Sequence, residues 1–316
     1  MQKRLISIVT PCYCEEKNVV EVSKRVAKVF KILDKYEYEH IFIDNCSPDG
    51  TVKILKGLAA QDKHIKLILN AKNFGHIRSP FYGLLQAKGD AVILLVSDLQ
   101  DPPEMIIDLI KKWEEGFKIV IGTKNKSEES PVMFALRKLY YGMIKKISET
   151  EHIKNFTGFG LYDQKFIEVL RQLDDPYPYF RGLVAELGFE RAEINYTQPK
   201  RKRGKTNNNF YTLYDIGMLG FVNHSKVPIR IASFIGFCAA IASLLIAVGY
   251  LIYKIMFWDR FDLGTAPMVI GLFFFASVQL FFIGIIGEYI GAIFTQVRNR
   301  PLVIERERVN FDKKSS

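Results

Sequence analysis

The sequence predicts an α/β domain with a mostly parallel sheet, followed by a hairpin of two transmembrane helices. Three observations carry this prediction. Short apolar runs alternate with segments of helical periodicity as far as residue 123, polar clusters follow the apolar runs, and two long, nearly uncharged stretches lie near the C-terminus. Alternating strands and helices build a parallel sheet covered on both faces, and roughly 20 apolar residues cross a bilayer.

The expected strands are short apolar or β-branched runs. They lie at residues 5–10, 41–43, 65–69, 91–96 and 118–123. Apolar residues at helical spacing, or helix-closing residues such as Gly89, predict helices between them. These lie at residues 17–33, from 51 to about 60, and at 79–88 and 103–113.

Polar clusters directly follow the expected strands, at residues 11–15, 44–49, 73–76 and 98–101. Ligands of parallel sheets bind outside the carboxyl ends of the strands. We therefore expect these clusters to form one binding site. A nucleotide-binding dehydrogenase is disfavoured, because Pro11-Cys12-Tyr13-Cys14-Glu15 stands where that class has a glycine-rich turn.

The chain is basic, with 44 Lys and Arg against 34 Asp and Glu, a net charge of +10. This balance suits an anionic partner. Basic residues gather at 200–205 and beside the apolar stretches, which favours a phosphorylated substrate and a membrane surface over nucleic acid. The four cysteines have no zinc-site spacing. They fit a reduced cytosolic setting, as does an N-terminus without a signal-peptide pattern.

Two stretches predict membrane spans. Residues 231–258 contain one charge, Lys254, and residues 266–297 contain only Glu288. Each is long enough for a bilayer core of about 30 Å, although a buried pair of core helices is the alternative. The short link at 259–265 puts both flanks on one side. The basic flanks place that side in the cytoplasm: Lys226, Arg230, Arg298 and Arg300.

The expected domain boundaries follow from these stretches. A cytoplasmic domain at 1–207 precedes a juxtamembrane amphipathic segment at 208–230, spans at about 231–257 and 267–295, and a cytoplasmic tail at 298–316. The amphipathic residues 131–147 suit either a membrane-interface helix or an ordinary surface helix. Glycines at 284, 287 and 291 around Glu288 predict close helix packing and a homo-oligomer.

An acidic loop follows the fourth expected strand. Asp98, Gln100 and Asp101 are hard oxygen ligands of the kind that Mg²⁺ or Mn²⁺ prefers when it bridges a diphosphate. Acids at a helix start are also common without any metal. The surrounding pattern favours the metal site.

Five motifs occur in one order along the chain: Pro11-Cys12-Tyr13-Cys14-Glu15-Glu16, residues 41–51, Asn73-Phe74-Gly75-His76, Gly89-Asp90 and Asp98-Leu99-Gln100-Asp101-Pro102-Pro103-Glu104. Together they resemble the inverting glycosyltransferase family 2, whose members have a GT-A fold. With Tyr179-Phe180-Arg181-Gly182-Leu183, the basic segment 201–211 and two spans, nearly the whole chain is similar to the polyprenyl-phosphate glycosyltransferases. That group includes dolichol-phosphate mannose synthases and bactoprenol glucosyltransferases.

The resemblance implies transfer of a hexose from a UDP- or GDP-sugar to a polyprenyl phosphate, with undecaprenyl phosphate favoured. It implies a magnesium or manganese ion held by Asp98 and Gln100, and catalytic roles for Asp98, Arg203 and Lys205. The nucleotide-sugar residues that it implies are Pro11, Tyr13, Glu15, Asp44, Ser97 and Asp98. The implied contacts to the acceptor phosphate are Lys124, Arg137, Arg181, Arg203 and Lys205.

The chain departs from the family pattern at acidic positions. Val96 stands where the family has the first Asp of Asp-Ala-Asp, and Thr157-Gly158-Phe159-Gly160 stands for Gly-Asp-Phe-Arg. A phosphate monoester has a second pKa of about 6, so its oxygen is already anionic at pH 7 and needs cations instead of a base. Two alternatives remain, namely a non-catalytic nucleotide-sugar-binding membrane subunit and a family 2 transferase with a glycan acceptor.

Overall fold

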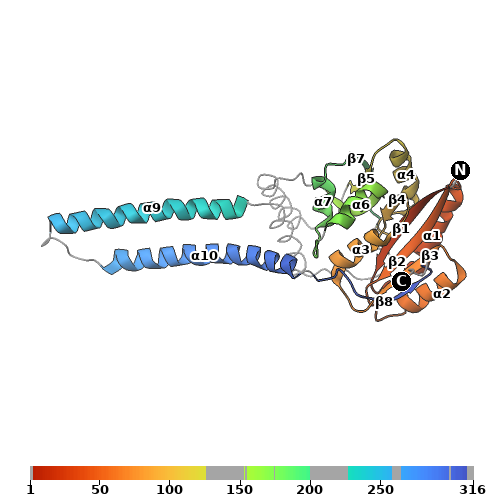
Figure 1. Cartoon of the computed structure of the whole chain (residues 1–316), viewed down its shortest axis with the longest axis horizontal. Coiled ribbons are helices and arrows are strands. Elements are labelled where there is room, and N and C mark those ends of the chain that lie inside the picture. Colours follow the sequence, from red (N-terminus) through yellow and green to blue (C-terminus); the bar gives the residue numbers. More distant parts are fainter. Residues whose placement is uncertain are drawn as a thin grey trace.

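Eight strands form one sheet in the computed structural model of the chain (Figure 1). The structure describes residues 3–125, 153, 155–173, 175–199, 227–257, 265–298 and 300–311. In chain order the strands are β1 (Arg4–Cys12), β2 (Tyr36–Asp44), β3 (Ile65–Asn70), β4 (Ala91–Leu94), β5 (Ile119–Lys124), β6 (Phe156–Asp163), β7 (Arg191–Tyr196) and β8 (Glu305–Val309). Their order across the sheet is β7-β5-β6-β4-β1-β2-β3-β8.

The helices connect these strands and then leave the domain. They are α1 (Val19–Ile32), α2 (Thr51–Gln61), α3 (Gly75–Gln86), the 3-10 turn η1 (Pro103–Met105), α4 (Ile106–Glu114), α6 (Gln164–Gln172), α7 (Phe180–Glu186), α9 (Val227–Met256) and α10 (Thr265–Val297).

The sheet is mostly parallel, as predicted. β1 pairs in parallel with β2 and β4, β2 with β3, and β5 with β7. β6 is antiparallel between β4 and β5, and β8 is antiparallel to β3. The central strand β4 is buried along its whole length, as expected of a strand covered on both faces.

Helices cover both faces of the sheet. On one face, Ile8 belongs to a cluster with Val26 of α1 and Ile106 of α4. On the other, the neighbouring Val9 belongs to a cluster with Phe81 of α3. Successive residues of a strand point to opposite faces, so β1 contributes to both cores. This confirms the predicted α/β architecture.

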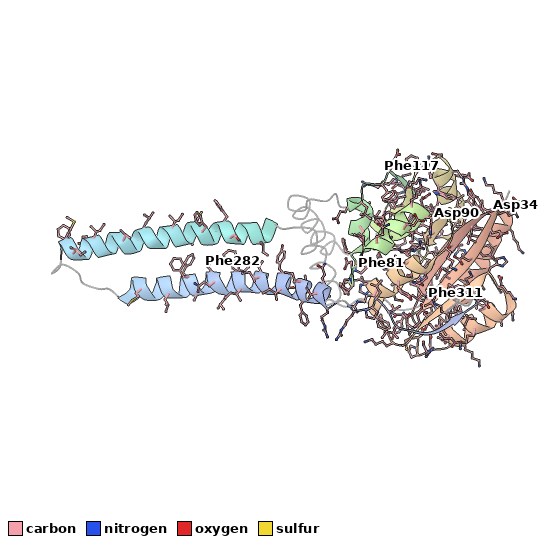
Figure 2. All side chains as sticks on the ribbon, in the orientation of Figure 1. Asp34, Phe81, Asp90, Phe117, Phe282 and Phe311 are labelled. Carbon is pink, nitrogen blue, oxygen red and sulfur yellow. The ribbon has the colours of Figure 1, made fainter. Side chains whose placement is uncertain are left out.

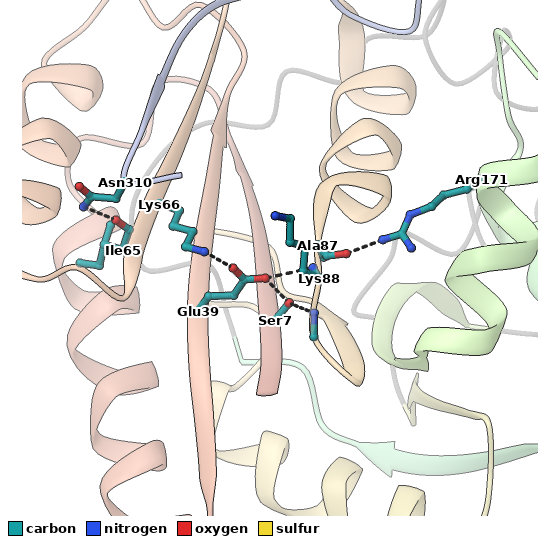
Figure 3. A network of polar contacts seen from close by, with 9 residues as sticks. Ser7, Glu39, Ile65, Lys66, Ala87, Lys88, Arg171 and Asn310 are labelled. Atoms are coloured by element: carbon teal, nitrogen blue, oxygen red, sulfur yellow. Dashed lines mark hydrogen bonds and ion pairs between the residues drawn. The ribbon is translucent and has the colours of Figure 1, made fainter. Parts of the chain in front are cut away.

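The strand β2 begins five residues before the expected 41–43, because its first half alternates aromatic and acidic residues and has no apolar run. Glu39 in this half is only 3% exposed. Its carboxylate accepts hydrogen bonds from Lys66 Nζ (2.6 Å), the Lys88 backbone N–H (3.2 Å) and the hydroxyl of Ser7 (Figure 3). The charge of the carboxylate is thereby paired inside the domain.

The same network holds the turn before β4. Ser7 Oγ accepts from the Gly89 backbone N–H at 2.9 Å. A Cβ on Gly89 would lie 2.7 Å from Leu5 O, so only glycine fits there. Arg171 of α6 donates to Ala87 O at 2.5 Å from the other side (Figure 3). These contacts fix the start of β4, and therefore the position of the acidic loop at its other end.

The C-terminal strand β8 was not predicted, since the sequence indicated only a tail at 298–316. Asn310, just after it, donates to Ala59 O (2.7 Å) and to Ile65 O (2.8 Å) (Figure 3). Arg308 bonds Gln86 of α3 (2.6 Å) and Glu305 (2.5 Å). The chain therefore returns to the sheet after α10.

The helices α9 and α10 are 30 and 33 residues long. They extend side by side from the domain (Figure 1). Figure 2 shows their side chains projecting outward, whereas Phe81 lies inside the domain. In the part of the chain that the structure describes, one segment, Phe274–Val297, is long and apolar enough to cross a membrane, with a mean hydropathy of 1.7. The two-span hairpin stays a prediction, and residues 131–147 and 208–226 lie outside the described residues.

Candidate active site

A cleft of about 620 Å³ opens at the carboxyl ends of β1, β2 and β4. Residues from all the predicted polar clusters line it, so the clusters do converge on one site. The lining is Pro11, Cys12, Tyr13, Glu15, Asn45, Asn73, Gly75, His76, Ser79, Pro80, Val96, Ser97 and Asp98.

Asn45 organises one wall of the cleft. Its side-chain amide donates to Asn73 Oδ1 (2.8 Å) and to Gly75 O (3.1 Å). Its side-chain oxygen accepts from the Phe74 backbone N–H (2.9 Å) and from Asn70 Nδ2 (3.1 Å). One buried side chain thus ties the loop after β3 to the end of β2. Asn45 and Asn73 both belong to the polar clusters predicted from the sequence, but the sequence did not indicate the hydrogen bond between them.

Asp44 lies behind the lining of the cleft. It is fully buried, and burial raises the pKa of its carboxyl group. It accepts from the Ser47 backbone N–H at 2.9 Å, and Ser47 Oγ accepts from the Cys14 backbone N–H at 3.0 Å. Asp44 therefore shapes the loops on which Tyr13 and Glu15 stand, and its nucleotide contact stays a prediction.

Three residues near the cleft have left-handed backbone conformations. They are Cys14 (φ 59°), Cys46 (φ 63°) and Leu99 (φ 60°). This conformation costs residues other than glycine, asparagine or aspartate about 1–2 kcal/mol. The backbone near the cleft is therefore strained at three positions, two of which are cysteines.

The acidic loop divides into an open part and a buried part. Asp98 lines the cleft, and its carboxylate accepts from the Gln100 backbone N–H at 3.1 Å. Asp101 is only 2% exposed and accepts a hydrogen bond from the hydroxyl of Tyr196 on β7. Burial raises the pKa of Asp101 to about 6. Gln100 is half-buried and absent from the cleft lining.

The donor set for a metal ion is therefore small. Among the described residues, no three His, Cys, Asp or Glu side chains come together as a metal site. Magnesium is commonly held by one or two carboxylates together with substrate phosphates and water. Asp98 fits that role, with the side-chain oxygen of Gln100 as the only further predicted ligand.

Lys124 interacts electrostatically with the acidic loop. Lys124 ends β5 and is half-buried, and burial lowers its pKa. The charges of Asp101 and Asp98 oppose that shift, and the charge of Arg181 adds to it. The structure thus brings Lys124 and Arg181 into one electrostatic group with the acidic loop. The other predicted phosphate contacts, Arg137, Arg203 and Lys205, lie outside the described residues.

Val96 and Gly158, which stand where the resembled family has acidic residues, both lie near the end of β4. In the register of β4 and β6, Leu94 faces Gly160. Val96 lies two residues beyond the end of β4, and a Cβ on Gly158 would lie 3.4 Å from a side-chain carbon of Leu94. Asp163 does not replace them, because it caps α6 and accepts from Trp113 Nε1 (2.7 Å) and Lys118 Nζ (3.1 Å).

A second, smaller pocket of about 180 Å³ adjoins the cleft. The two share Pro11, His76, Pro80 and Val96. The sequence did not predict this pocket, because its walls come from α3, β4 and the start of α7. We call it the side pocket. Its remaining lining is Ile77, Phe81, Leu84, Leu94, Thr157, Pro178, Tyr179, Phe180 and Arg181.

Comparison with known families matches residues 7–170 to "Glycosyl transferase family 2". The bactoprenol glucosyl transferase of Shigella phage SfII is 31% identical over 95% of this chain and 96% of that protein. An uncharacterized glycosyltransferase of Synechocystis sp. is 32% identical over 95% of this chain and 94% of its own length. A mannosyl-3-phosphoglycerate synthase structure from Rubrobacter xylanophilus covers 74% of this chain and 75% of its own, with 16% identity and a TM-score of 0.47.

Proposed function

Because the chain belongs to glycosyltransferase family 2 and is a glycosyltransferase, we propose that it transfers a hexose from a UDP- or GDP-sugar to a polyprenyl phosphate. Relatives named bactoprenol glucosyl transferase, similar over nearly their full length, support a polyprenyl-phosphate acceptor. The observation that carries the proposal is the cleft itself. It joins Asp98 to the loops after β1 and β2 and adjoins the side pocket, which Arg181 lines.

The absence of acids at Val96 and Gly158 is compatible with this acceptor. A phosphate oxygen is anionic at pH 7 and attacks the anomeric carbon without losing a proton. The bond from that carbon to the new phosphate oxygen forms as its bond to the nucleoside diphosphate breaks. A single displacement of this kind inverts the anomeric configuration. The diphosphate leaves as an anion, so no proton transfer is needed.

Cations take the place of the base in this proposal. Lys124 interacts electrostatically with Asp98 and with Arg181, and the two cations orient the incoming phosphate and balance charge on the leaving diphosphate. Asp98 and Gln100 would hold a magnesium or manganese ion, which neutralises charge on the diphosphate. Asp98 is half-buried, which keeps its carboxylate accessible to a bound ligand.

The return of the chain to the sheet supports two membrane crossings. β7 precedes α9 and β8 follows α10, and both strands belong to the same sheet. A chain that leaves and re-enters one domain crosses a membrane an even number of times. If Phe274–Val297 spans the bilayer, a second crossing is needed, and we assign it to the 30-residue helix α9. We propose that the domain lies on the cytoplasmic side, as the basic flanks indicate.

The test is transfer of radiolabel from a panel of nucleotide-sugars to undecaprenyl phosphate by the full chain in detergent. We expect label in the lipid phase, loss of transfer with EDTA, and a loss of at least 100-fold in Asp98→Ala, since a group stabilising the departing charge contributes on this order. The matched control is Asp108→Ala on α4, where the side chain is 58% exposed. A complete donor panel without transfer to lipid, despite nucleotide binding, would refute the proposal.

A further inference from the structure

A hydrogen bond from the sheet holds the acidic loop after β4. Asp101 of this loop is only 2% exposed, and its carboxylate accepts from the hydroxyl of Tyr196, the last residue of β7. Hydrogen bonds to a carboxylate are stronger than those between neutral groups. The bond therefore fastens the loop to the end of a strand that lies 95 positions further along the chain.

The hydroxyl of Tyr196 has a fixed position because the ring that carries it is confined. Tyr196 is 7% exposed, and its ring packs edge-on against Phe159 with the ring centroids 5.7 Å apart. Gly122 of β5 leaves room for the ring, since a Cβ at this position would lie 3.1 Å from Tyr196 Cε1. A ring packed in this way offers its hydroxyl at one place, and the loop is held there.

Lys124 is the neighbour of Tyr196 in the sheet. β5 and β7 pair in parallel, and Lys124 and Tyr196 are partners at the ends of the two strands (Figure 1). Val120 of β5 belongs to the same core cluster as Tyr196, and the even spacing from Val120 keeps Lys124 on that face. Lys124 also interacts electrostatically with Asp101 and Asp98. One hydrogen bond thus joins the strand ends that carry Lys124 to the loop that carries Asp98.

We propose that Tyr196 is a positioning residue, whose hydrogen bond to Asp101 keeps Lys124 and Asp98 at the separation that transfer requires. This inference rests on the proposed function, in which both groups act on the phosphates. Neither Tyr196 nor Asp101 lines the cleft, so each acts through other residues. Transition-state charge is stabilised by groups that are in place before the reaction, and a misplacement of about 1 Å can cost about 100-fold in rate.

The test measures transfer of radiolabel from a nucleotide-sugar to undecaprenyl phosphate by the full chain in detergent. Tyr196→Phe removes the hydroxyl and keeps the ring. We expect kcat to fall roughly 10- to 100-fold, the range that a hydrogen bond to a charged group supplies. The KM for the nucleotide-sugar should change by less than about threefold, because the bond acts on the transition state and not on substrate binding.

Asp101→Asn separates the hydrogen bond from the charge. Asparagine keeps an oxygen that accepts from Tyr196 but is not ionised. We expect kcat of Asp101→Asn to stay within about threefold of wild type, and the double variant Tyr196→Phe/Asp101→Asn to lose as much as Tyr196→Phe alone. A large loss in Asp101→Asn with little loss in Tyr196→Phe would assign the effect to the charge of Asp101 and overturn the proposal.

The matched control is Tyr36→Phe. Tyr36 is 8% exposed and donates to the carboxylate of Glu114, but it begins β2, at the end of the strand opposite to the cleft. This variant should lower Tm about as much as Tyr196→Phe does and leave kcat unchanged. Hydrogen exchange is a readout independent of transfer. It should rise in the acidic loop in Tyr196→Phe and stay unchanged there in Tyr36→Phe.

The outcomes separate the positioning role from the proposed function. Equal losses of kcat in Tyr196→Phe and Tyr36→Phe, or an effect of Tyr196→Phe on KM alone, would refute the positioning role and leave the proposed function standing. Unchanged kcat and unchanged exchange in Tyr196→Phe would do the same. No transfer to lipid phosphate by wild type would refute the proposed function, and the positioning role with it.

Discussion

Buried Asp101 makes the free energy of unfolding depend on pH, and the substitution Asp101→Asn isolates this contribution. The pKa of its carboxyl group is about 6 in the folded protein, raised mainly by burial. An unfolded aspartate has a pKa of about 3.9. The folded protein thus holds this proton more tightly than the unfolded chain does. Stability from this group is highest at low pH and falls as the pH rises from about 4 to about 6.

The magnitude follows from the two pKa values. At pH 8, ionised Asp101 costs about 3 kcal/mol of folding free energy, at about 1.4 kcal/mol per unit of pKa difference. At pH 4.5 the cost is about 1 kcal/mol. Asp101→Asn removes the ionisation and keeps an oxygen that accepts from Tyr196. The stability of the variant relative to wild type should therefore be about 2 kcal/mol more favourable at pH 8 than at pH 4.5.

The assay is thermal unfolding of the full chain in detergent at both pH values. Two kcal/mol corresponds to roughly 4–8 °C in Tm for a domain of this size. Other titrating groups contribute equally to both proteins and cancel. One of these groups is buried His40, whose pKa is lowered by burial to about 3. Its neutral form stabilises the fold, and this stabilisation is lost as the pH falls below 6.5. Asp108→Asn is the exposed control. A relative stability that stays constant with pH, or that worsens at pH 8, would refute the reasoning.

Two further predictions concern packing and the C-terminal return. Gly160→Ala should lower stability by about 1–3 kcal/mol, since its Cβ would lie 2.5 Å from Val120 O. Gly57→Ala in α2, with open space around its Cβ, should be neutral or stabilising by about 0.5–1 kcal/mol in the same thermal unfolding experiment, and equal effects at both positions would contradict the packing argument. Asn310→Ala should cost about 1–3 kcal/mol, because it removes the bonds to Ala59 O and Ile65 O. Hydrogen exchange should then rise in β8 and at the end of α2, and unchanged exchange there would show that Asn310 does not anchor the strand.

The central part of the fold was predictable because its strands are apolar on both faces. β1, β3, β4 and β5 each contain the apolar run that the sequence indicated. The missed strands β6, β7 and β8 lack such a run. Glycines interrupt the apolar residues of β6, β7 is mostly half-buried, and β8 reads Glu-Arg-Glu-Arg-Val along the edge of the sheet. Their place is decided by pairing with neighbours, which a local pattern does not contain.

The site was predictable in its location and less so in its contacts. The topology of parallel strands brings polar clusters to one edge, and the cleft lies at that edge. The bond from Tyr196 to Asp101 joins residues 95 positions apart, and no motif signals it. Nor did the sequence show that Leu94 of β4 pairs with Gly160 of β6, since no local pattern contains the pairing of strands so far apart in the chain.

The return of β8 to the sheet has a consequence for the synthesis of the protein. β3 ends at Asn70, whereas its partner strand begins at Glu305, so the ribosome must make both long helices before that side of the sheet is closed. Until then β3 presents an open edge of unpaired backbone groups, which is a template for aggregation. Synthesis of both helices therefore precedes completion of the sheet. A fragment that stops before α9 leaves this edge exposed permanently, however complete its motifs are.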